Sequence, residues 1–84
     1  SDVKLALMRK LWEERKEIKI NQNGEEEIIR KGVPWLKSSL ARNIEKPLKE
    51  TDQAIQDLNG IFRRRNFSSL KIKRANGVRL IVEI

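Results

Sequence analysis

The sequence contains neither cysteine nor histidine among its 84 residues. Without cysteine it forms no disulfide and no thiolate metal site, and it suits a reducing cytoplasm. Without histidine it lacks the commonest general base and the commonest metal ligand. The usual hydrolytic triads and a Gly-rich phosphate loop are missing too. The sequence therefore predicts a protein that is not an enzyme, with no cofactor and no bound metal.

Long apolar runs are also missing. No stretch approaches the roughly 18–20 residues that cross a bilayer, and no secretory h-region opens the chain. Apolar residues make up 38% of the chain and charged residues 37%, which is typical of a soluble globular domain. We therefore expect one small domain spanning residues 1–84, located in the cytoplasm (on the nucleoid if the source is bacterial), with no membrane partner and no small-molecule substrate.

Positive charge is abundant and unevenly placed. The chain has a net charge of +7, and residues 30–84 alone carry thirteen basic and five acidic side chains. Residues 1–29 are close to neutral, with six basic and seven acidic side chains. A regional excess of this size attracts polyanions and is typical of nucleic-acid-binding proteins. The alternative is that the charge serves solubility alone, because lysine and arginine are ordinary surface residues.

The first third of the chain predicts a helix followed by an ambiguous segment. Apolar residues recur at helical spacing from residue 3 to about residue 16, and Asp2 stands where an N-cap residue would. Residues 17–20 alternate like a strand, and Asn23-Gly24 is a strong turn signal. Glu25–Ile29 either returns as a second strand or begins a short helix.

The remaining two thirds predict two helices and a hairpin. Pro34 is placed for the first turn of a helix over residues 34–44, and Pro47 interrupts that helix. Thr51 is a candidate N-cap for a helix that runs to about Arg65. The alternating residues on either side of Asn76-Gly77 predict a β-hairpin over residues 69–84.

The order of these elements resembles the winged helix-turn-helix domains. The resemblance rests on "SSLARNIEKPLKETDQAIQDLNGIFRRR" followed by "LKIKRANGVRLIVEI". It implies a small α+β fold of three main helices, with a helix-turn-helix over residues 34–65 and a C-terminal β-hairpin wing over residues 69–84. The connection "EKPLKE" is longer than the minimal turn of that family, and it has no glycine.

The resemblance implies sequence-selective binding to double-stranded DNA, with the second helix of the motif in the major groove. The base-reading candidates at the start of that helix are Lys49, Thr51, Gln53 and Gln56. The candidates for phosphate and wing contacts are Lys37, Ser38, Arg63, Arg64, Lys71, Lys73, Arg74 and Arg79. Such a domain acts by occupancy, bending or recruitment, either as a small transcription regulator or as a phage or mobile-element accessory factor of DNA recombination.

Two alternatives stay open. The chain is a winged-helix module for protein interaction in a larger assembly, or it forms a homodimer through apolar surface of the first helix near Met8 and Trp12. Single-stranded nucleic acid ranks below duplex DNA because stacking needs exposed rings. Of the four aromatic residues, only Phe67 stands outside a core-like position.

Overall fold

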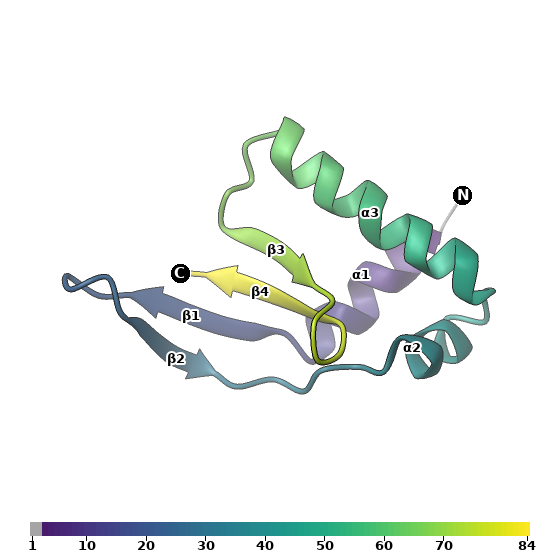
Figure 1. Cartoon of the computed structure of the whole chain (residues 1–84), viewed down its shortest axis with the longest axis horizontal. Helices are drawn as coiled ribbons and strands as arrows, with labels where there is room; N and C mark the ends of the chain where they lie inside the picture. Colours follow the sequence, from purple (N-terminus) through teal and green to yellow (C-terminus); the bar gives the residue numbers. More distant parts are fainter. Residues whose placement is uncertain (1–2) are drawn as a thin grey trace.

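The computed structural model describes residues 3–84, in which three helices and four strands form a small α+β fold (Figure 1). The elements are, in chain order, α1 (Val3–Glu13), β1 (Lys16–Ile20), β2 (Glu26–Arg30), α2 (Lys37–Asn43), α3 (Leu48–Arg64), β3 (Leu70–Lys73) and β4 (Arg79–Glu83). The predicted N-cap, Asp2, lies outside the described residues.

The strands of residues 3–84 form one mixed sheet in the order β2-β1-β4-β3. Two antiparallel hairpins, β1–β2 and β3–β4, are joined by parallel pairing between β1 and β4. The ambiguous segment after α1 is therefore a strand hairpin, and the alternative of a short helix is wrong. In Figure 1 the turn of the β1–β2 hairpin projects away from the helices, at the opposite end of the molecule from α2.

The core lies between the three helices and one face of the sheet. Its fully buried members come from every helix and from β4, and include Leu7, Leu11, Leu40, Ile55 and Leu80. Ile72 of β3 joins the same cluster. The apolar stripes read from the sequence at helical and strand spacing account for this cluster, because each element is too short to be stable without burying its stripe.

The second helix starts later than Pro34. Trp35 donates a backbone hydrogen bond to Val78 at 2.8 Å and accepts one from it at 2.7 Å. This isolated antiparallel bridge holds Trp35 in an extended conformation, so α2 begins only at Lys37. The prediction of a helical turn at Pro34 is wrong because a partner 43 residues along the chain takes the backbone groups that a helix would use.

The third helix begins at Leu48, directly after Pro47, so the prediction of Thr51 as its N-cap is wrong. Thr51 lies within the first turns of α3 and is completely buried. Its hydroxyl donates to the carbonyl oxygen of Pro47 at 3.0 Å. Because this bond satisfies the hydroxyl inside the helix, Thr51 tolerates a core position that its capping preference does not indicate.

The turn between α2 and α3 contains a left-handed residue although it has no glycine. Glu45 has a φ of 57°. Its N–H donates to the Arg42 carbonyl at 3.1 Å, and the N–H of Lys46 donates to the Ala41 carbonyl at 3.0 Å. These two bonds form a Schellman motif, which closes the C-terminus of a helix and normally has glycine at the left-handed position.

The extended segment Gly32–Leu36 links the two halves of the molecule through close backbone contacts. Gly32 has a φ of 67°, and a Cβ there would collide with the carbonyl oxygens of Glu14 and Arg15. At the other end, a Cβ on Gly77 would lie 2.8 Å from the Cβ of Pro34. Both glycines are required because other main-chain or ring atoms occupy the space of a side chain.

Glu45→Gly should stabilise the protein. A left-handed conformation costs a non-glycine residue about 1–2 kcal/mol, and glycine removes this strain from the folded state. Glycine also raises the conformational entropy of the unfolded chain, which offsets part of the stabilisation. We expect the free energy of unfolding to rise by about 0.5–1 kcal/mol in urea denaturation. Glu50→Gly, an exposed position in the first turn of α3, is the matched control and should lower stability. Equal losses in both variants would contradict the strain at Glu45.

Candidate functional site

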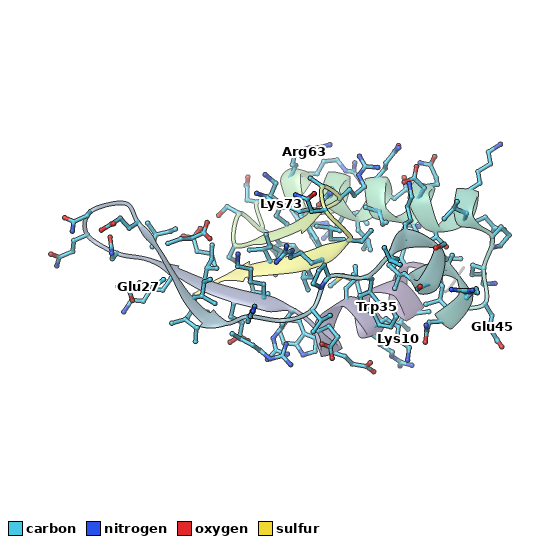
Figure 2. All side chains as sticks on the ribbon, turned by 60° about the horizontal axis from the view of Figure 1, so that its bottom comes forward. Lys10, Glu27, Trp35, Glu45, Arg63 and Lys73 are labelled. Atoms are coloured by element: carbon cyan, nitrogen blue, oxygen red, sulfur yellow. The ribbon has the colours of Figure 1, made fainter. Side chains whose placement is uncertain are left out.

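The outer face of α3 carries polar and basic side chains opposite the buried stripe. At 100° per residue, a set of six positions falls within an arc of about 100° on the side away from Thr51, Ile55 and Leu58. The set consists of Lys49, Gln53, Gln56, Gly60, Arg63 and Arg64. In Figure 2 side chains project from the solvent side of α3, and Arg63 is labelled among them.

A shallow hollow of about 540 Å³ runs along this face. Its lining comes from α1, α3 and the turn after β3, and consists of Lys4, Gln53, Gln56, Asp57, Asn59, Gly60, Ile61, Arg63, Arg64 and Arg74. Four of these residues are basic and one is acidic. The structure thus brings five of the predicted site residues together at one surface: Gln53, Gln56, Arg63, Arg64 and Arg74.

The two glutamines differ in how free their amides are. The Gln53 amide donates to the carboxylate of Asp57 at 3.0 Å, and that carboxylate lies 4.0 Å from Lys4 of α1. Gln56 is exposed one turn further along the same face. To contact a ligand, the Gln53 amide must give up its hydrogen bond to Asp57. Gln56 is therefore the stronger candidate for reading a base.

The other predicted base readers have opposite outcomes. Lys49 is exposed on the outer face of α3, although it does not line the hollow. Thr51 points into the core and has no exposed surface. The assignment of Thr51 as a base-reading residue is wrong because its side chain lies on the opposite side of the helix from Lys49 and Gln53.

Asp52 is shared by two of the predicted phosphate-binding residues. Its carboxylate accepts from Lys37 of α2 at 3.1 Å and from Arg74 after β3 at 3.4 Å. The hydrogen bond from Lys37, together with the charges of Lys37 and Arg74, lowers the pKa of Asp52 below its ordinary value, although partial burial acts in the opposite direction. One carboxylate thus offsets part of the positive charge of two candidates, and it ties α2, α3 and the hairpin together at one point. Ser38, the neighbouring candidate, is exposed.

The hairpin divides its basic side chains between two surfaces. Lys71 and Lys73 alternate with the buried Ile72, so they lie on the sheet face opposite the helices. Arg79 pairs in register with Lys73 and shares that face. Arg74 instead turns toward α3 and lines its hollow. The predicted wing residues therefore do not form one surface.

Gly60 falls within the same arc of α3, yet it is buried rather than exposed. A Cβ there would approach only the flexible Arg64 guanidinium, at 3.1 Å, so packing does not require glycine. Glycine in a helix interior costs about 1 kcal/mol relative to alanine. Because the residue is covered, it offers no exposed backbone to a ligand.

No helix within residues 3–84 is long and apolar enough to span a membrane. Over the same residues, no cluster of acidic side chains has the geometry to hold a metal ion. The interaction between Lys37, Asp52 and Arg74 had no sequence signal, because its three members lie far apart along the chain.

The Asp52 interaction predicts a pH-dependent contribution to stability. Because the folded-state pKa is lowered from 3.8, the contribution is present above the unfolded-state value and is lost as the pH falls through the folded-state value. We expect Asp52→Asn to be less stable than the wild type at about pH 6, and the difference to shrink as the pH falls below 3.8. Urea denaturation across a pH series measures the difference in unfolding free energy between the wild type and Asp52→Asn.

Glu27→Gln removes an exposed carboxylate of β2 and is the matched control, for which a much smaller difference is expected. A difference between the wild type and Asp52→Asn that is unchanged at the lowest pH would contradict the electrostatic origin.

The chain was also compared with known proteins. No protein-family model, no curated protein and no solved structure matches it.

Proposed function

We propose that the chain binds double-stranded DNA through the outer face of α3, as the resemblance to winged helix-turn-helix domains implies. The observation that carries the proposal is the hollow along that face, where two glutamines lie among Lys4, Arg63, Arg64 and Arg74. Glutamine makes bidentate contacts with adenine, and arginine neutralises phosphates. The surface therefore combines side chains for reading bases with side chains for holding the backbone.

The dimensions of α3 suit the major groove. The helix has 17 residues and is therefore about 25 Å long. With side chains it is roughly 10–12 Å across, close to the 12 Å width of the groove. The arginines at one end of the face are then placed to contact a flanking strand, while Gln56 faces the base edges.

The arrangement of elements also supports a winged-helix domain. Helices α2 and α3 are joined by a short turn with a left-handed residue, and a β-hairpin follows α3. Two features extend the expected pattern. The β1–β2 hairpin stands between α1 and α2, and the β3–β4 turn packs on Pro34 rather than projecting freely. In this proposal the hairpin contributes Arg74 to the α3 surface and does not reach out as a separate arm.

In this proposal the domain acts by occupying a site, by bending the duplex or by recruiting a partner. These modes of action suit a transcription regulator and an accessory factor of recombination equally.

A protein-interaction module is the second candidate, and one observation favours it. Leu5 and Trp12 of α1 are 53% and 47% exposed, and they lie with Met8 on one side of the helix, away from Leu7 and Leu11. Large apolar side chains grouped on a surface are typical of protein contacts. Salt dependence separates this function from DNA binding, because apolar contacts respond weakly to salt.

The proposal predicts strongly salt-dependent binding to duplexes of any sequence. With about five phosphate contacts, log K against log salt should have a slope of about −4.5. Arg63→Ala and Arg64→Ala should each weaken binding and flatten the slope by about 0.9. Fluorescence anisotropy with a labelled random duplex measures both effects.

Arg9→Ala is the matched control, since Arg9 is exposed on α1 and does not line the α3 hollow. A wild-type slope shallower than about −2 would favour the protein-interaction module instead.

Base reading by Gln56 predicts a loss that depends on sequence. Gln56→Ala leaves the net charge unchanged, and exposed substitutions change stability by no more than about 0.5 kcal/mol. On a duplex selected from a random pool, the variant should lose about 1–3 kcal/mol of binding free energy, with almost no loss on random duplex. Gln22→Ala, in the exposed β1–β2 turn, is the control. Equal losses on both duplexes would exclude Gln56 as a base-reading residue.

A further inference from the structure

Phe67 is an exposed aromatic ring held in a defined position at the end of α3. The helix closes with a second Schellman motif, in which Asn66 has a φ of 58°. The N–H of Phe67 donates to the carbonyl of Phe62 at 2.8 Å, and the N–H of Asn66 donates to that of Arg63 at 3.3 Å. These bonds fix the backbone of Phe67, yet its side chain remains 48% exposed.

Two hollows border Phe67, and every charged residue that lines them is basic. The first, of about 470 Å³, lies between α3 and β3 and is lined by Asn59, Phe62, Arg63, Asn66, Phe67, Ser68, Leu70 and Lys71. The second, of about 450 Å³, is lined by Ile61, Arg64, Arg65 and Phe67. Phe67 therefore stands beside three arginines, Arg63, Arg64 and Arg65, and the apolar Phe62 and Leu70 line the first hollow with it.

Trp12 shows that exposure alone does not create such a site. It is exposed to nearly the same extent as Phe67, at 47%. The guanidinium of Arg15 already lies over its ring, 4.0 Å from the ring centroid, and Glu13 borders the hollow beside it. At Trp12 a cation therefore already occupies one face of the ring, and the surround is not uniformly positive.

Helix capping does not require an aromatic residue at Phe67. The residue at this position of a Schellman motif packs against the last turn of its helix, and any apolar side chain serves that purpose. Phe62, five residues before Phe67, belongs to the core cluster and is 7% exposed. Half of the Phe67 ring remains available to a planar ligand.

We propose that Phe67 is a stacking platform for one unpaired nucleobase, and that the preferred DNA is a duplex with a short single-stranded extension. Base–aromatic stacking combined with cationic contacts to the backbone is the usual means of binding unpaired nucleotides. Arg63 lines the hollow next to the ring and is placed to hold a phosphate beside the stacked base. A single platform suits one nucleotide rather than a long single strand.

This inference rests on the proposed function, because the platform adjoins the α3 surface. Asn59 and Arg63 line both the hollow along α3 and the hollow beside Phe67. A duplex that lies on α3 with a phosphate at Arg63 therefore ends next to the ring, and the first unpaired nucleotide beyond the duplex reaches it.

The test compares a blunt duplex with the same duplex carrying a two-nucleotide extension, for the whole chain at one fixed salt concentration. The wild type should prefer the extended duplex by about 5- to 150-fold, the range expected for one stacked base. Phe67→Ala should abolish the preference and leave binding to the blunt duplex unchanged. Phe67→Leu, which keeps an apolar side chain at this position, should do the same. Phe67→Tyr should retain the preference, and Trp12→Ala should not alter it.

A 2-aminopurine in the extension reports stacking directly, because its fluorescence falls when it stacks. We expect quenching with the wild type and with Phe67→Tyr, and none with Phe67→Leu.

Equal affinity of the wild type for the two duplexes would overturn the platform, as would loss of the preference in Trp12→Ala. Equal weakening of both duplexes by Phe67→Leu would also overturn it. Failure of the proposed function has a different signature, namely no binding to the blunt duplex. Saturable binding of an acidic peptide that depends on Phe67, without a preference for the extended duplex, would assign the surface to a protein partner and overturn the proposal.

Discussion

The close backbone contacts of the segment Gly32–Leu36 hold the structure together at its centre. At one end Gly32 lies against the carbonyls of Glu14 and Arg15, just after α1, where the Arg30 guanidinium also donates to the carbonyls of Arg15 and Glu13. At the other end Trp35 forms its two backbone hydrogen bonds with Val78. The segment therefore fixes the β1–β2 hairpin, the start of α2 and the β3–β4 turn relative to one another. A side chain at Gly32 would force these elements apart.

The charge distribution of the α3 surface depends on that arrangement. Because the β3–β4 turn is held against Pro34, Arg74 comes within reach of Asp52 and of the hollow along α3. Asp52 in turn draws Lys37 from the start of α2. A carboxylate inside a basic surface lowers the local positive potential and orients two cations whose side chains are otherwise long and flexible. It thereby limits the number of free phosphate contacts at this end of α3, while Arg63 and Arg64 provide positive charge toward the other end.

Helices α2 and α3 both end with a left-handed residue. Glu45 follows the C-terminus of α2 and Asn66 follows the C-terminus of α3, each within a Schellman motif. Asparagine adopts this conformation readily, whereas glutamate does so under strain. The first motif sets the path from α2 into α3. The second directs the chain from α3 into β3 and leaves Phe67 at the surface. Asn59 then joins the two elements, since its amide donates to the Ile72 carbonyl and accepts from the Ile72 N–H, both at 2.9 Å.

The sequence by itself determined the local elements of this protein. The alternation around Asn76-Gly77, the break at Pro47 and the apolar stripe of α3 each arise from interactions between residues close in the chain, so their patterns identify a hairpin, a boundary and a buried helix face. The same stripe placed Gln53, Gln56, Arg63 and Arg64 on the outer face. The tertiary structure decided the features that depend on residues far apart in the chain, namely the conformation of Trp35, the burial of Thr51 and the pairing of Asp52. Val78 keeps Trp35 extended, the core takes up Thr51, and Asp52 gathers Lys37 and Arg74. No local pattern encodes these contacts, because whether a side chain is buried, paired or free depends on residues that only the folded chain brings beside it.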